Sequence, residues 1–267
     1  MDYKILCSDL DGTLLTYKDN VSDFTISEIK RIKEHLRIIL VSARMPQSMT
    51  YIQKNLGIEN EPIICYNGAL VLHGSKELFS TYINMEQITS IYEMANKAGI
   101  QLGLYSNSEW YVVKDSERVQ KEIKYTKTLP TFRDTQATIE DWRDRKMGAH
   151  KIMLMGNKEN TDSLFPILQE NFNQTLNLYR SNDTLIEIAP KSVSKLTAIK
   201  LLLEEHESLN DVIAFGDNYN DMEMLQNVGL GIAVGNAREE VKQIAKVITL
   251  ENTKDGVAQY LKRHILI

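Results

Sequence analysis

The sequence predicts an α/β protein in which a smaller α+β unit interrupts a domain built on a parallel sheet. Short apolar runs alternate with amphipathic helical patterns over residues 3–65, and the same alternation returns after residue 194. Between these two parts, strand and helix patterns follow in mixed order. Polar turns rich in carboxylates end apolar runs in the outer parts but not in the middle one. We therefore expect the outer parts to form one domain and the middle to form another.

The first strand and helix are expected near the N-terminus. Tyr3 to Ser8 is a short apolar run that stops at the polar turn beginning with Asp9, which is typical of a buried strand entering a loop. Thr25 and Glu28 have the spacing of a capping box, so we expect the first helix to begin at Thr25. Apolar residues then recur at helical spacing, namely Ile26, Ile29, Ile32 and Leu36.

Two more buried strands and a helix are expected before residue 70. Arg37 to Val41 is apolar and β-branched, and so is Glu61 to Cys65. Pro46 suits the first turn of a helix between them, and Gly57 suits its end. Strand, helix, strand, helix and strand in this order indicate right-handed crossovers and a parallel sheet.

The carboxyl ends of these strands are where polar side chains gather. Asp9, Ser42 and Asn67 each lie at or just beyond the end of a predicted strand. Because the carboxyl ends of parallel strands meet at one edge of a sheet, we expect these residues to share a site.

Residues 83–188 are expected to form the inserted α+β unit, and residues 1–82 with 189–267 the surrounding domain. Glu187 to Pro190 is expected to be the return crossing. The elements expected within the insert are helices at 85–98, 117–125 and 161–171 and strands at 100–105, 109–113, 151–155, 176–180 and 185–188.

The parallel pattern resumes after the insert. We expect a helix from Ser194 to Glu205, a strand from Asp211 to Phe215 and a strand from Gly229 to Val234. The polar turn Gly216–Asp221 follows the first of these strands and enters a helix. It falls at the same kind of position as Asp9.

Composition excludes several classes of function. The formal net charge of −5 lacks the basic footprint of a nucleic-acid binder and gives no attraction to anionic membranes. No apolar run approaches the roughly 20 residues that span a bilayer. Cys7 and Cys65 lie in apolar runs and are expected to be buried thiols, and neither is followed six residues later by arginine. We expect a cytoplasmic protein, monomeric or weakly homo-oligomeric, that binds neither nucleic acid nor membrane.

Four carboxylates indicate a magnesium site. Asp9 and Asp11 are two residues apart at a strand end, and Asp217 and Asp221 are one helical turn apart at another. Like charges held so close repel unless a cation or proton lies among them. Hard carboxylate oxygens of this kind are the ligands that Mg²⁺ prefers.

Other residues could bind a phosphate next to these carboxylates. Ser42 offers a hydroxyl and Ala43 a backbone N–H, while Asn220 adds an amide. Lys195 lies at the start of a predicted helix, where the helix N-terminus also attracts anions. Charge on transferring phosphate oxygens is stabilised by such donors.

These residues resemble the four motifs of the haloacid dehalogenase-like superfamily. Asp9–Leu14 is similar to the first motif and Gly216–Asp221 to the fourth, while Ser42 and Lys195 match the second and third. The motifs stand in the family's order across nearly the whole chain. The large insert resembles the C2-type cap of the Cof-like branch. Two of the motifs depart from the family pattern. In the second motif Ala43 replaces a glycine, and around Lys195 in the third motif Ser192 and Leu196 stand where the family often has glycines.

The resemblance implies a Rossmann-like core domain and a phosphatase of small phosphorylated metabolites such as sugar phosphates or phosphorylated cofactors. It implies that Asp9 is the nucleophile, forming an aspartyl phosphate, and that Asp11 is the general acid and base. Mg²⁺ would be bound by Asp9, Asp217 and the Asp11 main-chain carbonyl. Asp221 would either bind the metal, directly or through water, or orient Lys195. The phosphate would be held by Ser42, the Ala43 N–H, Lys195 and Asn220. The cap would exclude water and select the leaving group.

Other functions also fit parts of this pattern. A phosphomutase would share all four motifs and transfer the phosphoryl group to a sugar. A dehalogenase needs no metal, and it would not keep Asp11 together with the acidic fourth motif. A receiver module also carries a phosphorylatable aspartate, but it is about half this length and has no insert. A catalytically silent binding protein would be expected to lose the carboxylates that are present here.

Overall fold

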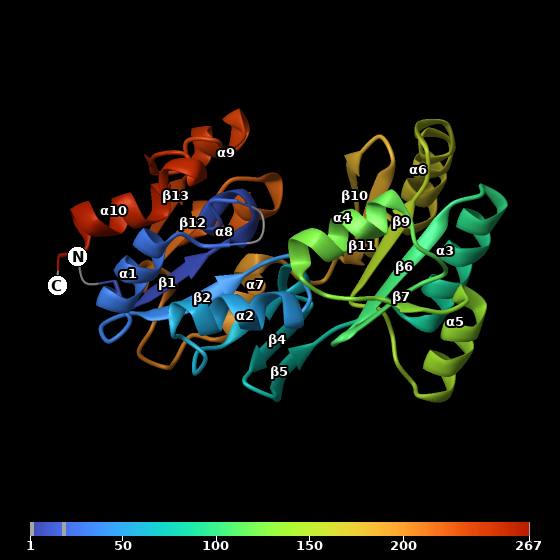
Figure 1. Cartoon of the computed structure of the whole chain (residues 1–267), viewed down its shortest axis with the longest axis horizontal. Helices are drawn as coiled ribbons and strands as arrows, with labels where there is room; N and C mark the ends of the chain where they lie inside the picture. The colour runs from blue at the N-terminus through green and yellow to red at the C-terminus, as the bar shows by residue number, and fades with distance from the viewer. Residues whose placement is uncertain (1–2, 18–19, 267) are drawn as a thin grey trace. The chain divides into compact units, whose positions relative to one another are not determined.

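The computed structural model describes residues 3–17 and 20–266 of the chain (Figure 1). The chain divides into two compact units, Met1–Phe79 with Val193–Ile267, and Ser80–Ser192. These limits lie a few residues from those expected. The first boundary falls at the end of Lys76–Ser80, the last strand of the first sheet along this part of the chain.

The first unit is built on an eight-stranded sheet with the order β14-β13-β12-β1-β2-β3-β4-β5. Neighbouring strands from β14 to β3 are parallel, whereas β4 is antiparallel to β3. The strands are β1 (Ile5–Ser8), β2 (Arg37–Val41), β3 (Ile63–Cys65), β4 (Leu70–His73), β5 (Lys76–Ser80), β12 (Val212–Gly216), β13 (Leu230–Ala233) and β14 (Val247–Ile248). The predicted α/β class with a parallel-sheet core is confirmed.

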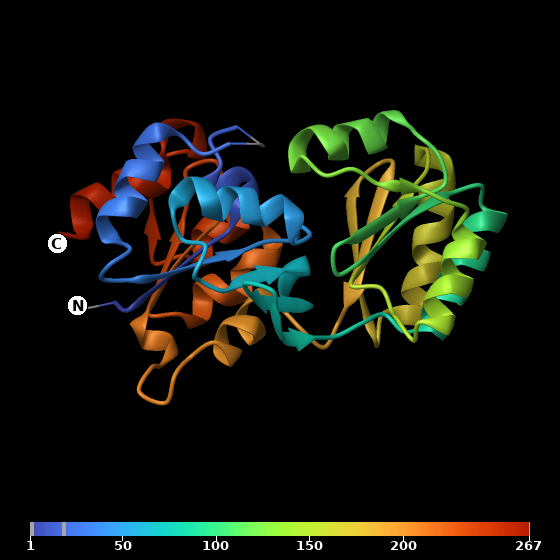
Figure 2. The ribbon, with the colours of Figure 1, turned by 60° about the horizontal axis from the view of Figure 1, so that its bottom comes forward.

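Helices flank both faces of this sheet, as Figure 2 shows. Contacts group α1 with α2 and α10, and α8 with α7 and α9. The helices are α1 (Asp23–Ile32), α2 (Gln47–Leu56), α7 (Lys195–Leu201), α8 (Met222–Asn227), α9 (Glu239–Ile244) and α10 (Gly256–His264).

Helix α1 begins earlier than its capping-box spacing suggested. Its N-cap is Ser22, whose hydroxyl accepts a hydrogen bond from the Thr25 N–H at 3.0 Å. Thr25 is therefore inside the first turn and not the cap. The expectation of a cap at Thr25 was wrong because Ser22, three residues earlier, already satisfies a free N–H of the helix.

The strand order places a switch point in the middle of the sheet. From β1 the chain moves outward through β2 and β3, and later it moves the other way from β12 through β13 to β14. β1 and β12 are therefore neighbours, and Ser8 pairs with Phe215. The crevice beyond the carboxyl ends of two such strands is where α/β proteins bind ligands.

The second unit contains a six-stranded sheet with the order β10-β11-β9-β6-β7-β8. All neighbours are antiparallel except β7 and β8. The strand expected at 185–188 is present and extends to Pro190, so Glu187–Pro190, also expected as the return crossing, is part of a strand that pairs with β10. The strands are β6 (Gln101–Ser106), β7 (Glu109–Val112), β8 (Thr131–Phe132), β9 (Lys151–Met155), β10 (Leu176–Asn182) and β11 (Leu185–Pro190).

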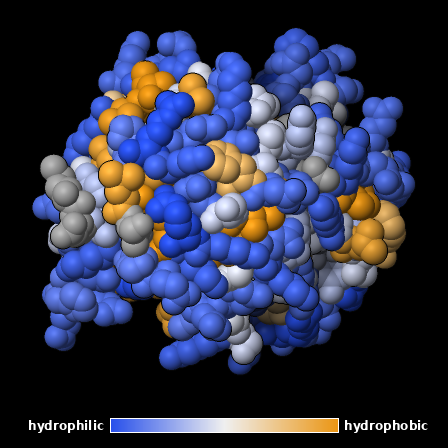
Figure 3. All heavy atoms as spheres, turned by 60° about the vertical axis from the view of Figure 1, so that its left-hand side comes forward, coloured by the Kyte–Doolittle hydropathy of each residue, from blue (hydrophilic) through white to orange (hydrophobic). Residues whose placement is uncertain are grey.

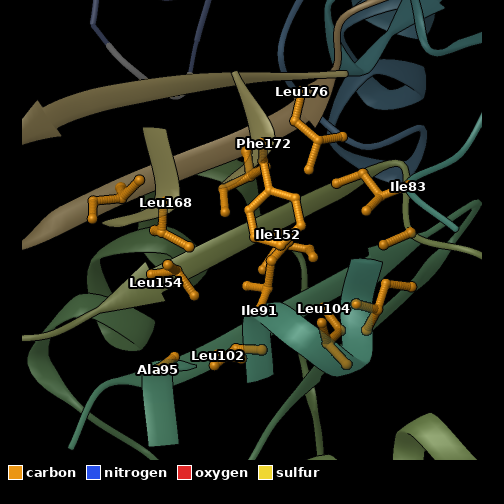
Figure 4. Packing of buried hydrophobic residues seen from close by; sticks show 14 of the residues in the cluster. Ile83, Ile91, Ala95, Leu102, Leu104, Ile152, Leu154, Leu168, Phe172 and Leu176 are labelled. Carbon is orange, nitrogen blue, oxygen red and sulfur yellow. The ribbon is translucent and has the colours of Figure 1, made fainter. Parts of the chain in front are cut away.

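The core of the second unit lies between this sheet and three of its helices, α3, α5 and α6 (Figure 4). Leu102 and Leu104 of β6 and Ile152 and Leu154 of β9 point into it, because alternate residues of a strand share a face. Ile91 of α3 packs against them. The helices of this unit are α3 (Met85–Lys97), α4 (Glu117–Thr126), α5 (Thr135–Asp144) and α6 (Lys158–Phe172).

A buried histidine makes the stability of the protein depend on pH. His150 is fully buried, with Nδ1 accepting from the Asn107 N–H and Nε2 paired with Ser80 Oγ, both at 3.0 Å. Burial lowers the pKa of His150 from 6.5 to about 3. Below pH 6.5 the unfolded chain therefore takes up a proton that the folded chain excludes, and stability is lost as the pH falls. Lowering the pH from 7 to 5 is expected to reduce the free energy of unfolding by about 2 kcal/mol through this group.

Thermal unfolding of wild type and His150→Asn at both pH values measures this effect. Asparagine keeps a polar side chain but does not titrate, so the variant should lose less stability between pH 7 and pH 5. An equal loss in both proteins would show that other groups carry the pH dependence.

The surface carries scattered apolar groups. Figure 3 shows a face that is mainly hydrophilic, with small separate apolar areas. Among the described residues, none of the helices combines the length and the hydrophobicity that crossing a bilayer requires.

Candidate active site

Three of the predicted carboxylates meet where β1 and β12 end. Asp9 follows β1, and its N–H donates to the Phe215 carbonyl of β12 at 3.1 Å. Asp217 follows the last residue of β12. Carboxylate oxygens of Asp9, Asp217 and Asp221 all lie within 4.8 Å of one another. The structure thus brings together three of the four carboxylates that the sequence singled out.

The loop after Asp9 folds against Asp217. Gly12 has φ of +84°, and a Cβ atom there would lie 2.5 Å from Asp217 Oδ2. Thr13 donates its hydroxyl to Asp217 Oδ1 at 3.1 Å. Only glycine fits both the backbone angle and the close approach. Thr13 was not singled out from the sequence, although it belongs to the first motif.

Lys195 lies within the acidic cluster. Its Nζ donates to Asp9 Oδ1 at 2.5 Å and to Asp221 Oδ1 at 2.7 Å, and its side chain is 0% exposed. The capping serine Ser194 starts α7, so Lys195 is the first residue of that helix. A lysine buried to this extent needs such ionic partners.

Both carboxylate oxygens of Asp221 accept hydrogen bonds. While Oδ1 accepts from Lys195, Oδ2 accepts the N–H groups of Asp217 and Asn218, both at 3.0 Å. The carboxylate therefore ties the turn after β12 to Lys195.

The cluster carries more negative than positive charge. Burial raises the pKa of Asp9 well above its usual range, Lys195 opposes this, and Asp221 and Asp217 add to it. Burial, followed by the charge of Asp221, raises the pKa of Asp217 to about 6. Burial opposes the charged form of Lys195, but Asp221 and Asp9 together raise its pKa.

These residues fit a hard divalent cation. The donor set consists of carboxylate oxygens from three aspartates that lie within 4.8 Å of one another, and Lys195 is the cation that contacts Asp9 and Asp221. Mg²⁺ suits oxygen ligands of this kind.

Asp11 points to a different partner. Its two carboxylate oxygens accept hydrogen bonds from Nε and Nη2 of Arg44, each at 2.7 Å. The Arg44 side chain is 4% exposed, whereas that of Asp11 is 43% exposed. Asp11 is thus outside the three-carboxylate group, and Arg44 is a functional candidate that sequence reasoning missed. Its position two residues after Ser42, in the turn of the second motif, was the available signal.

The remaining predicted phosphate ligands lie on the neighbouring loops. Ser42 is buried at the end of β2 and its Oγ accepts from the Arg44 N–H at 3.3 Å, while Ala43 is half-buried. Asn220 donates through Nδ2 to Asn67 Oδ1 at 2.9 Å. Asn67 was expected to share the site because it follows a strand, but the sequence does not indicate what it contacts.

Comparison with known proteins agrees with this arrangement. A family described as haloacid dehalogenase-like hydrolase matches residues 6–261. A protein named putative phosphatase from Haemophilus influenzae is 33% identical over 98% of both chains. The 5-amino-6-(5-phospho-D-ribitylamino)uracil phosphatase of Bacillus subtilis is 27% identical over 97% of both chains.

A solved structure of a haloacid dehalogenase-like hydrolase from Bacteroides thetaiotaomicron has a TM-score of 0.89 and 28% identity. The likeness covers 98% of this chain and 99% of that one. The strand order, the converging carboxylates and these matches lead to one conclusion: the chain belongs to the haloacid dehalogenase-like hydrolase family.

Proposed function

We propose that this phosphoric monoester hydrolase is a Mg²⁺-dependent phosphatase of small phosphorylated metabolites that works through a phosphorylated Asp9. The observation that carries the proposal is the convergence of Asp9, Asp217 and Asp221 around Lys195 at the switch point of the sheet. Asp9 is a buried carboxylate beside the Lys195 ammonium, and a divalent cation among the three carboxylates would add positive charge. Such a carboxylate is suited to attack an anionic phosphate.

In the first step, a carboxylate oxygen of Asp9 forms a bond to phosphorus while the bond from phosphorus to the leaving oxygen breaks. Asp11, turned away from Arg44 and in its protonated form, supplies its proton to that oxygen and becomes a carboxylate. In the second step, Asp11 takes a proton from water, the water oxygen bonds to phosphorus and the bond to Asp9 breaks. Inorganic phosphate leaves, and both carboxylates return to their starting state.

Asp11 must turn for these steps. In the structure Arg44 holds its carboxylate with two hydrogen bonds. The high exposure of the Asp11 side chain leaves room for such a turn. We propose that Arg44 holds Asp11 in an inactive position until the leaving group is bound.

The phosphate oxygens would be held by Lys195, Ser42, the Ala43 N–H and Asn220. These groups donate to oxygens on which negative charge spreads during transfer. Asp221 would act by holding Lys195, because both of its carboxylate oxygens are already engaged.

Asp9, Asp217 and the Asp11 main-chain carbonyl would hold Mg²⁺. When bound, Mg²⁺ offsets the negative charge shared by Asp9 and the phosphate, which otherwise repel each other.

Sugar phosphates and phosphorylated cofactors or their precursors are the proposed substrates. The Bacillus subtilis relative named above acts, by its name, on a phosphorylated ribityl compound. We propose that the unit Ser80–Ser192 selects the leaving group and limits access of water.

Hydrolysis of p-nitrophenyl phosphate tests the proposal. Purified protein should release p-nitrophenolate with Mg²⁺, lose at least about 100-fold of its rate in excess EDTA, and recover when Mg²⁺ is restored. Phosphate release without any sugar acceptor separates hydrolysis from mutase activity. A rate that EDTA leaves unchanged would contradict the proposed metal dependence, and absence of hydrolysis with every phosphate monoester of a broad panel would contradict the function.

A further inference from the structure

A short left-handed turn follows β3, at the same edge of the sheet as the carboxylates. Tyr66, Asn67 and Gly68 have φ values of +51°, +57° and +105°. Residues other than glycine rarely adopt these angles, although asparagine tolerates them better than most. A buried tyrosine in this conformation indicates that the surrounding contacts hold the turn in place.

The backbone of the turn holds both ends of the second-motif loop. The Tyr66 N–H donates to the Arg44 carbonyl at 3.1 Å, and the Asn67 N–H donates to the Ser42 carbonyl at 2.9 Å. Ser42 and Arg44 are thus fixed through their main chain.

The Asn67 side chain extends the connection to the fourth-motif loop. Its Oδ1 accepts the hydrogen bond from Asn220 Nδ2 at 2.9 Å. This bond joins residues 153 positions apart in the chain. It fixes the amide of Asn220 in one orientation, so that the group does not have to be ordered when a phosphate binds.

Gly68 brings the turn against the helix that carries Lys195. A Cβ atom at Gly68 would lie 2.4 Å from the Ser194 carbonyl oxygen and 3.2 Å from the Ala198 Cβ atom. Ser194 is the N-cap of α7, and Lys195 follows it directly. The position of Lys195 therefore depends on this close approach.

We propose that the turn Tyr66–Gly68 is a positioning element that aligns Ser42, Asn220 and Lys195, and that Asn67 is its central positioning residue. The inference rests on the proposed function, because these three residues are the ones proposed to hold the phosphate. It adds Asn67 to that function as a residue that acts through Asn220.

Asn67→Gly tests the side chain alone, since glycine accepts the left-handed backbone and keeps the N–H bond to Ser42. We expect kcat/KM for p-nitrophenyl phosphate and the affinity for inorganic phosphate with Mg²⁺ each to fall about 5- to 10-fold, as for one lost hydrogen bond. Asn220→Ala should cause a loss at least as large, because it removes the proposed phosphate donor itself. The double variant should match Asn220→Ala within about 2-fold, because the Asn67 side chain acts through Asn220.

The matched control is Asn107→Gly, the same substitution at another left-handed asparagine, with φ of +48°. It should leave phosphate affinity unchanged. Calorimetric titration with inorganic phosphate makes the test independent of turnover. If the wild-type protein binds phosphate but hydrolyses no phosphate monoester, the proposed function is contradicted. The phosphate affinities of the variants still decide the positioning role in that case.

Unchanged phosphate affinity in Asn67→Gly would overturn the inference. The inference would also be overturned if the losses of phosphate affinity in the two single variants multiplied in the double variant. If the wild-type protein neither binds inorganic phosphate nor hydrolyses p-nitrophenyl phosphate, both proposals are overturned. Losses confined to the melting temperature would show a structural role only, and would likewise overturn the positioning role.

Discussion

Asp9→Asn is expected to lower phosphatase turnover by at least about 10,000-fold, because an amide cannot form the phosphorylated intermediate. The fold should survive. Asparagine has nearly the shape of aspartate, its Oδ1 can still accept from Lys195, and the Asp9 N–H bond to Phe215 is a main-chain contact. Removing one charge from a cluster in which Asp217 and Asp221 repel Asp9 should leave stability equal or slightly higher.

Single-turnover phosphate release and thermal unfolding, measured on the same preparation, check both parts of this prediction. Asp211→Asn is the matched control. Asp211 lies at the opposite end of β12 from Asp217 and pairs with Lys4 at 3.6 Å. It should retain wild-type turnover. Near wild-type hydrolysis by the Asp9 variant would exclude Asp9 as the nucleophile.

The fold class and the convergence of the motifs could be predicted because both follow from local patterns. Apolar runs that end in Asp9 and Asp217 identify parallel strands, and topology places the carboxyl ends of such strands together. The order of the strands in the sheet could not be predicted from these local patterns. The neighbouring positions of β1 and β12, which bring those two residues together, emerge only from the folded chain.

The partner of Asp11 could not be predicted from spacing. Residues two apart at a strand end were expected to face the same side, which would place Asp11 with Asp9. The chain instead leaves the strand at Asp9, and the turn through Gly12 sends the Asp11 side chain to Arg44. The alternation of a strand therefore does not extend into the loop. The hydrogen bonds of Thr13 to Asp217 and of Asn220 to Asn67 also form between loops, where no repeating pattern gives the direction of a side chain.

Element ends were the least predictable part of the fold. The start of α1 depended on whether Ser22 or Thr25 acts as the cap, and both residue types are good caps. The strand expected to end at Ile188 continues to Pro190, because its last residues pair with β10. Such choices depend on partners distant in sequence.

Lys195→Met is expected to damage stability and activity together. The lysine is the cation within 2.7 Å of both Asp9 and Asp221, and all three side chains are almost fully buried. Removing one partner of a buried ionic group leaves charge without compensation and costs about 3–5 kcal/mol. For a protein of this size that corresponds to a fall in melting temperature of about 10 °C. Turnover should fall at least about 100-fold as a phosphate donor is lost.

Thermal unfolding in EDTA and in Mg²⁺ measures the charge effect. Because a divalent cation can replace part of the lost positive charge, Mg²⁺ should raise the melting temperature of Lys195→Met more than that of wild type. Lys200→Met, an exposed lysine on the same helix, is the matched control and should behave as wild type. Equal stability of Lys195→Met and wild type in EDTA would contradict the ionic role of Lys195.

The double variant Lys195→Met with Asp221→Asn separates the two effects. Asparagine keeps an oxygen for the N–H groups of Asp217 and Asn218 but removes the charge that Lys195 had offset. Part of the lost stability, about 1–2 kcal/mol, should return, since one unpaired buried charge is gone. Turnover should not return, because phosphate binding needs the ammonium group itself. Joint recovery of stability and turnover would instead mean that Lys195 serves the fold and not the chemistry.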